Sequence, residues 1–363
     1  MIAPAPLDRH MRRIFSLLFL SVVALLGCGS SEAVSHHSDA GLDAASADAG
    51  PDGPGDAGSA TTAGFGFNAK GSLNTLEQLT LAEPVLKGLS AKLRARLVIR
   101  VNGGTASQQE TSADWTDVQV SQWASLQSKH KIRLSYVVNG NDTPAGQAAF
   151  VQRWRQAGVE FAFLELMNEY YLAKFRNGDT TKPEVTRKVT IDDYVDEIVP
   201  AFQKELAPLK IPTFVIAAPA NPSVTGTDWN AAWNDGIVAA FTSRSEFQGL
   251  GVTLHLYDRC LGSYEYAQID ELRVRLPPGT PIAITEAGLL CDSLSTYDQV
   301  TAKLKPHLSG IHSKLLPGDY LLDQVLYNPY ANDVTATVHP STSGITPKGQ
   351  AVVDLFEEWA GKN

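Results

Sequence analysis

Two glutamates, Glu169 and Glu286, each follow an apolar segment whose composition is typical of a buried β-strand. Glu169 comes after Val159–Met167 and directly follows Asn168, and Glu286 comes after Pro281–Thr285. If the two strands lie in one parallel barrel, their carboxyl ends meet at one mouth and the two side chains face each other. Two facing carboxyl groups suit the cleavage of a glycosidic bond, in which one protonates the departing oxygen and the other attacks or stabilises the anomeric carbon.

The rest of residues 64–363 supplies the strands and helices that such a site requires. Eight apolar runs recur there, and they are continuous rather than alternating, as is typical of parallel strands buried on both faces. The runs are Gly64–Asn68, Arg96–Asn102, Ile132–Asn139, Val159–Met167, Thr213–Ala218, Gly251–Tyr257, Pro281–Thr285 and Tyr320–Tyr327. The helical segments expected between them are Thr75–Leu93, Ser121–His130, Pro144–Ala157, Ile191–Leu206, Trp229–Ser243, Glu265–Arg275, Thr296–Lys314 and Thr346–Trp359. Eight strands each followed by a helix predict one (β/α)8 TIM barrel, which takes about 250 residues.

A doubly wound open sheet is the alternative fold. It usually has fewer strands and a glycine-rich phosphate turn after the first of them. The segment Gly64–Asn68 does not have that pattern, so we favour the barrel. Besides the two glutamates, the strand ends that would form the mouth of a barrel hold Arg100, Asn139, Asn168, His255, Tyr257 and Tyr327.

The motifs at four of these strands resemble those of glycoside hydrolase clan A, the barrels with a catalytic glutamate on strands four and seven. Asn168-Glu169 is similar to the pair in which the Glu is the acid/base and the Asn binds the sugar 2-hydroxyl. Thr285-Glu286-Ala287-Gly288 is similar to the strand that carries the nucleophile. The resemblance implies a retaining enzyme that cleaves a β-linked poly- or oligosaccharide by double displacement.

Two further motifs resemble family 5 of this clan. His255-Leu256-Tyr257 is similar to a His-x-Tyr motif whose Tyr donates a hydrogen bond to the nucleophile. Arg100 matches the Arg that ends strand two and keeps the nucleophile ionised. The resemblance therefore implies that Glu286 is ionised at neutral pH and that Glu169 holds its proton more tightly.

The chain departs from family 5 at two strands, so the resemblance is to the clan. Asn139 stands where family 5 usually has a His on strand three, and Tyr327 falls where a Trp usually forms the floor of the site. These departures favour an alternative, a non-catalytic carbohydrate-binding or scaffold protein on a decayed barrel. The intact pair of glutamates favours the enzyme, because decayed enzymes commonly lose one carboxylate.

Composition excludes several other classes of protein. The net charge of −9, from 30 basic and 39 acidic residues, argues against nucleic-acid binding, which needs a basic face. The eight histidines are scattered, and no His-Glu-x-x-His, Cys-x-x-Cys or Gly-x-Ser-x-Gly motif occurs. We therefore expect no metal and no cofactor. The resemblance to clan A implies a carbohydrate as the partner, and we expect a monomer.

The N-terminus has the features of an export signal. Basic residues up to Arg13 precede the apolar run Ile14–Leu26, which is shorter than the roughly 20 residues of a membrane span. Leu25-Leu26-Gly27-Cys28 resembles the lipobox of bacterial lipoproteins, which implies an acylated Cys28 and a lipid-anchored protein of the cell envelope. Simple secretion is the alternative, and the start codon could be Met1 or Met11.

Residues 28–63 form a second region, between a signal peptide at 1–27 and the barrel at 64–363. They are rich in Gly, Ala, Ser, Asp and Pro, a composition that buries too little apolar surface to fold. We expect a disordered tether there. If Cys28 is lipidated, Cys260 and Cys291 remain in an oxidising compartment, in adjacent loops of the barrel. A disulfide between these two is expected, with free thiols as the alternative.

Overall fold

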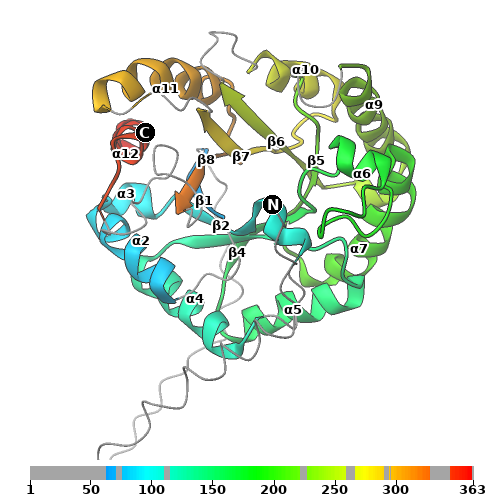
Figure 1. The fold of residues 1–363 in the computed structure, drawn as a ribbon, viewed down its shortest axis with the longest axis horizontal. Helices are drawn as coiled ribbons and strands as arrows, with labels where there is room; N and C mark the ends of the chain where they lie inside the picture. Colours follow the sequence, from blue (N-terminus) through cyan, green and yellow to red (C-terminus); the bar gives the residue numbers. More distant parts are fainter. Residues whose placement is uncertain are drawn as a thin grey trace, which may run out of the picture. The chain divides into compact units, whose positions relative to one another are not determined.

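The computed structural model describes residues 63–70, 76–109, 115–220, 227–258, 266–289, 294, 296–327 and 344–361, all within one compact unit. Eight parallel strands form a closed barrel in chain order (Figure 1). They are β1 (Gly64–Lys70), β2 (Leu97–Gly103), β3 (Arg133–Val138), β4 (Phe161–Leu166), β5 (Thr213–Ile216), β6 (Gly251–Asp258), β7 (Ile282–Leu289) and β8 (Tyr320–Tyr327). The predicted (β/α)8 fold and all eight strands are therefore confirmed.

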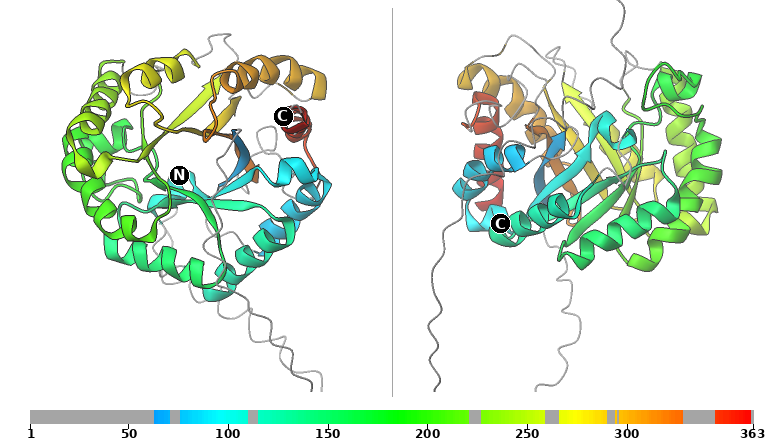
Figure 2. Two further views of the ribbon diagram at one scale, coloured as in Figure 1. Left: turned by 180° about the vertical axis from the view of Figure 1, so that it is seen from behind. Right: turned by 60° about the horizontal axis from the view of Figure 1, so that its bottom comes forward.

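Helices surround the barrel on the outside, and the ring they form is seen from behind in Figure 2. They are α2 (Leu76–Gly88), α3 (Ala91–Arg94), α4 (Asp117–His130), α5 (Pro144–Gln156), α6 (Ala173–Asn177), α7 (Val199–Leu206), α9 (Thr227–Ser243), α10 (Ala267–Arg275), α11 (Tyr297–His312) and α12 (Pro347–Gly361). Within the described ranges, no helix is long and apolar enough to cross a membrane.

Local sequence signals determine where several helices begin. Thr116 accepts a hydrogen bond from the backbone N–H of Gln119, whose side chain accepts one from the N–H of Thr116. This capping box starts α4 four residues earlier than the predicted start at Ser121. The predicted helix Thr75–Leu93 is in fact divided into α2 and α3, because Ser90 caps a new helix by accepting from the N–H of Leu93.

The interior of the barrel is layered. The layer nearer the strand starts is apolar and contains Val98, Phe163, Phe214, Ala283 and Leu322. Two residues further along the strands, where side chains again point inward, the buried residues are polar. They include Asn68, Arg100, Ser135, Glu165, Thr253 and Thr285. The barrel therefore places its buried polar groups toward the mouth formed by the carboxyl ends of the strands.

The ends of β4 and β5 are held by an aromatic side chain from a π-helix, η3 (Asp193–Ile198), which precedes α7. The hydroxyl of Tyr194 donates to the carbonyl of Leu166 (2.9 Å) and accepts from the N–H of Ile216 (3.2 Å). This hydroxyl takes the place of the next backbone bond of the ladder, so the two strands can diverge at the mouth. The predicted helix Ile191–Leu206 is thus π-helical in its first half, a form that often occurs at functional sites.

Several predictions concern residues outside the described ranges. These are the signal peptide at 1–27, nearly all of the tether, and all three cysteines, Cys28, Cys260 and Cys291. For Tyr327, the backbone at the end of β8 is described but the side chain is not. The lipid anchor, the disulfide and the floor of the site at strand eight therefore stay predictions.

Candidate active site

Arg100 lies at the centre of the polar layer and binds two carboxylates. Its Nε and Nη2 donate to the two oxygens of Glu165 at 2.8 and 2.9 Å, a bidentate arrangement. Its Nη1 donates to Oε1 of Glu286 at 2.8 Å. The side chains of Arg100 and Glu165 are fully buried, and that of Glu286 is 2% exposed. The guanidinium thus supplies positive charge to Glu286 and also neutralises Glu165, a buried carboxylate of β4.

Arg100 also orients two amide side chains. It donates to Oδ1 of Asn68 (3.1 Å) and to Oδ1 of Asn168 (2.9 Å). Because the oxygen of Asn168 faces the guanidinium, its Nδ2 is directed away from Arg100. The close packing explains the glycine at position 103, where a Cβ atom would lie 1.8 Å from Oδ1 of Asn68.

Glu286 lies within β7 rather than beyond its end, which corrects the predicted strand Pro281–Thr285. The register of β7 against β8 shifts between Ile284 and Ala287, and that of β6 against β7 shifts between Leu254 and His255. Such irregularities re-aim side chains in a strand. Here the glutamate points inward, where it accepts hydrogen bonds from Arg100 and from the hydroxyl of Tyr257.

The hydroxyl of Tyr257 donates a hydrogen bond to Oε2 of Glu286. Burial, followed by the charge of Glu286, raises the pKa of Tyr257 well above its ordinary value. The phenol therefore keeps its proton across the physiological range and can donate it in a hydrogen bond to the carboxylate.

Glu169 follows β4 in a left-handed backbone conformation, with φ of 51°. Its Oε1 lies 3.0 Å from Nδ1 of His255 and accepts from the hydroxyl of Tyr171 at 3.1 Å. Its Oε2 lies 3.3 Å from Nδ2 of Asn168. Its side chain is 22% exposed, against 2% for Glu286, so the two glutamates differ in their access to solvent.

His255 connects the two glutamates. Its Nδ1 contacts Glu169 at 3.0 Å, while its Nε2 lies 3.6 Å from Glu165 and 3.9 Å from Glu286. Burial lowers the pKa of His255, but the three carboxylates outweigh burial and raise the pKa to about 9. Both catalytic candidates thus lie within 4 Å of one imidazolium ring.

The net charge of the cluster formed by Arg100, His255 and the three glutamates depends on whether Glu169 is protonated. Burial raises the pKa of Glu165, but Arg100 and His255 more than offset it, so the pKa lies below its ordinary value. Two cations, Arg100 and His255, then balance two anions, Glu165 and Glu286, when Glu169 holds a proton.

The structure brings together six of the predicted site residues, Arg100, Asn168, Glu169, His255, Tyr257 and Glu286. Asn139 lies one residue after β3, where its Oδ1 accepts from the N–H of Asn141 (2.8 Å). Its own N–H donates to Oε1 of Gln147 (3.1 Å). These bonds hold the turn between β3 and α5, a structural role that the prediction of a substrate contact did not include.

The sequence analysis did not predict Gln108 or Asn102, which also lie at the site. Gln108, in the 3-10 turn η1 (Gly104–Gln108), donates to the carbonyl of Asn168 and so fixes the backbone before Glu169. Asn102 is fully buried at the end of β2 with φ of 60°, and neither of its amide atoms has a hydrogen-bond partner among the described residues. No motif marks either residue, although an Asn at a strand end in a barrel is a general signal.

Loop aromatics near the site pack rather than face open space. Tyr170 and Tyr171 are each 1% exposed, and Trp233 is fully buried. The hydroxyl of Tyr170 donates to Oδ1 of Asn141 (3.3 Å), and Nε1 of Trp233 donates to the carbonyl of Ile216 (2.9 Å). Packing, which is the commoner role of such residues, is therefore what the structure shows for Tyr170 and Trp233, whereas the hydroxyl of the buried Tyr171 bonds to Glu169.

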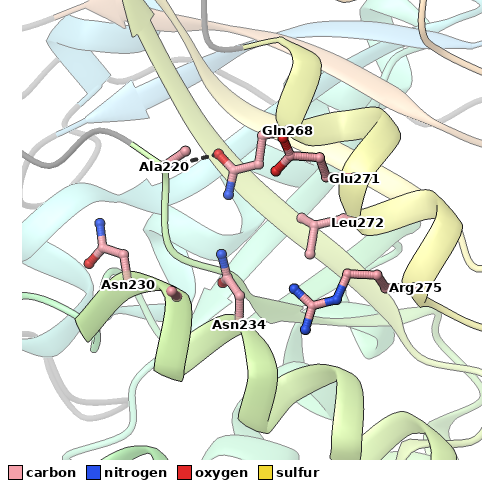
Figure 3. Close-up of a pocket in the computed structure, with 8 residues that line it drawn as sticks. Ala220, Asn230, Asn234, Gln268, Glu271, Leu272 and Arg275 are labelled. Carbon is pink, nitrogen blue, oxygen red and sulfur yellow. Dashed lines mark hydrogen bonds between the residues drawn. The ribbon is translucent and has the colours of Figure 1, made fainter. Parts of the chain in front are cut away.

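A separate pocket of about 260 Å³ lies between α9 and α10 (Figure 3). The amide side chains that line it form hydrogen bonds with the backbone after β5. Asn234 accepts from the N–H of Ala218 and donates to its carbonyl, and Gln268 accepts from the N–H of Ala220. Asn230 likewise donates to the carbonyl of Pro219. These hydrogen bonds hold the loop after β5 in place, so the amide side chains that line the pocket stabilise the fold.

Within the described residues, no group of three or more His, Cys, Asp or Glu is arranged to hold a metal ion.

No protein-family model and no curated protein matches the sequence. The fold is similar to that of a family 39 glycoside hydrolase from Bacteroides cellulosilyticus WH2, with a TM-score of 0.53 and 11% identity over 82% of this chain and 64% of that one. It is also similar to a GH39 β-xylosidase from Caulobacter crescentus, with a TM-score of 0.52 and 13% identity over 82% and 71% of the two chains. A third similar structure is an exo-β-1,4-mannosidase from Opitutaceae bacterium strain TAV5, with a TM-score of 0.50 and 11% identity over 85% and 61%. The chain thus spans less than two thirds of the first and third of these proteins, and its likeness to all three is one of fold.

Proposed function

We propose that the protein is a retaining glycoside hydrolase that cleaves β-glycosidic bonds of a poly- or oligosaccharide. The observation that carries this proposal is the asymmetry of the two glutamates around His255. Glu286 is buried against Arg100 and Tyr257, whereas Glu169 is partly exposed and lies in a cluster that is neutral when it is protonated. One ionised and one protonated carboxyl group are the nucleophile and the acid that double displacement needs.

In the first step, Glu169 gives its proton to the departing oxygen while Glu286 attacks the anomeric carbon and forms a glycosyl-enzyme. In the second step, Glu169 takes a proton from a water molecule, which attacks the same carbon and releases Glu286. Arg100 and Tyr257 keep Glu286 ionised for the attack. Nδ2 of Asn168 faces away from Arg100 and donates one N–H to Glu169, and its second N–H can contact the sugar 2-hydroxyl.

The test is a pair of single substitutions with chemical rescue. Glu286→Ala should abolish turnover, a loss of more than about 4 kcal/mol of transition-state stabilisation, and azide should restore it with an inverted glycosyl azide as product. Glu169→Ala should spare the first step for substrates with good leaving groups, and azide should then give a product of retained configuration. Glu160→Ala removes an exposed glutamate just before β4 and is the matched control.

A second candidate function is carbohydrate binding without catalysis, on a decayed barrel. The replacement of the usual strand-three His by Asn139 favours it, because Asn139 holds a turn. If both single variants kept the rate of the unsubstituted protein on a polysaccharide panel, the enzyme assignment would be wrong and this second candidate would replace it.

The proposed setting is the bacterial cell envelope. An acylated Cys28 followed by an acidic, glycine-rich tether would anchor the barrel to a membrane and let it reach carbohydrate outside the cell. This part of the proposal depends on the N-terminal sequence pattern.

A further inference from the structure

The acid/base candidate, Glu169, has two oxygens in different surroundings. Oε1 accepts from the hydroxyl of Tyr171 at 3.1 Å and lies 3.0 Å from Nδ1 of His255. Oε2 has the longer contact, 3.3 Å to Nδ2 of Asn168. Hydrogen bonds from two sides fix the position of Oε1, so the carboxyl group has a defined orientation about its last torsion angle.

Tyr171 is itself fixed by the helix α9. Its backbone carbonyl accepts a hydrogen bond from Nε1 of Trp229 at 2.6 Å. Its ring meets the ring of Trp233 edge to face, with centroids 6.4 Å apart, and Trp233 is anchored to the end of β5. Burial raises the pKa of Tyr171 well above its ordinary value, so the hydroxyl keeps its proton and donates. A rigid element outside the barrel thus positions one hydroxyl against Oε1.

We propose that Tyr171 is a positioning residue for Glu169, holding Oε1 so that Oε2 carries the proton that is delivered to the departing oxygen. This inference rests on the proposed function. The left-handed backbone of Glu169 supports it, because a non-glycine residue keeps that conformation only where its surroundings determine it. The backbone bond from Trp229 to Tyr171 and the side-chain bond from Tyr171 to Glu169 are such surroundings.

The hydroxyl of Tyr171 should also affect the ionisation of Glu169. A hydrogen bond donated to a carboxylate favours the charged form, so its loss should move the titration midpoint of Glu169 upward by about one pH unit. Among the residues that the structure describes, the other ionisable groups that act on this site are His255 and Tyr257 from β6, Glu286 from β7, Glu165 from β4 and Arg100 from β2. All of them are unchanged by a substitution that removes only the phenolic oxygen.

The experiment compares Tyr171→Phe with Tyr170→Phe. Both tyrosines are 1% exposed and adjacent in the chain, but the hydroxyl of Tyr170 donates to Asn141 instead of Glu169. For Tyr171→Phe, kcat/KM should fall about ten- to a hundredfold on glycosides with poor leaving groups and less than about threefold on dinitrophenyl glycosides, which need no protonation. The alkaline limb of the pH profile should move up by about one unit. Tyr170→Phe should show neither effect.

A second readout does not depend on turnover. The carboxyl carbon of Glu169, labelled with carbon-13 and assigned through Glu169→Gln, should titrate about one pH unit higher in Tyr171→Phe than in Tyr170→Phe. If the unsubstituted protein hydrolyses glycosides but the two Phe variants behave alike in rate, pH profile and titration, the role of Tyr171 is refuted while the proposed function stands. If the unsubstituted protein hydrolyses no glycoside, the proposed function fails and the inference fails with it.

Discussion

Replacing Arg100 by Met should reverse the way in which stability depends on pH. Arg100 is fully buried and makes five hydrogen bonds, three of them to the carboxylates of Glu165 and Glu286. Removing the cation from a buried ion pair costs about 3–5 kcal/mol, because the charge left behind is uncompensated. His255 stays 3.6 Å from Glu165, so we expect the lower end of that range, about 3 kcal/mol at pH 7.

The sign of the pH dependence follows from Glu165. In the unsubstituted protein its pKa lies below the ordinary value, so its stabilisation is present above the unfolded pKa and is lost as pH falls through the folded pKa. In Arg100→Met, burial dominates and the folded pKa rises above the unfolded one. The variant should therefore be relatively more stable at low pH and lose stability as pH rises through the folded pKa.

Urea unfolding followed by circular dichroism at pH 5 and pH 7.5 measures both quantities. Arg96→Met is the matched control, since Arg96 bonds to the carbonyls of Ala63 and Trp359 at the other end of β2. The free energy of unfolding of Arg100→Met should be higher at pH 5 than at pH 7.5, which Arg96→Met should not show. If Arg100→Met lowered the free energy of unfolding by less than about 1 kcal/mol at pH 7.5 and the pH trend did not reverse, the cluster would not be ionised as described.

Three other predictions concern ionisation and covalent chemistry. Because the pKa of His255 is raised to about 9, the contribution of His255 to the free energy of unfolding is fully present below about pH 6.5 and should be lost between pH 6.5 and 9. Urea unfolding should show this loss in the unsubstituted protein but not in His255→Gln. Cys260 and Cys291 should be joined, so thiol titration of the unfolded, unreduced protein secreted without Cys28 should find none, and two reactive thiols would contradict the bridge. Mass spectrometry of the envelope protein should find a mature N-terminus at an acylated Cys28, and an unmodified start beyond it would refute lipidation.

The sequence predicts most of the fold because each barrel strand is a continuous apolar run, which depends only on local composition. It predicts the site less completely, because the site depends on irregular backbone. Glu286 points inward through shifts of register in β7, and no residue pattern marks those shifts. Tyr171 reaches Glu169 through a left-handed backbone and an anchor on α9, a helix more than fifty residues further along the chain. Gln108 is recognisable only once the loop after β2 is seen beside Asn168.

The bidentate pair of Arg100 and Glu165 has a consequence for how this site can change in evolution. Losing Arg100 alone leaves the carboxylates of Glu165 and Glu286 buried without that cation, whereas exchanging all three for apolar residues of similar volume can be neutral or stabilising. A descendant that abandons hydrolysis could discard Glu169, which is at the surface of the site, in one step. Positions 100, 165 and 286 should instead change together, so matched apolar residues there would identify lineages in which the barrel has become only a scaffold.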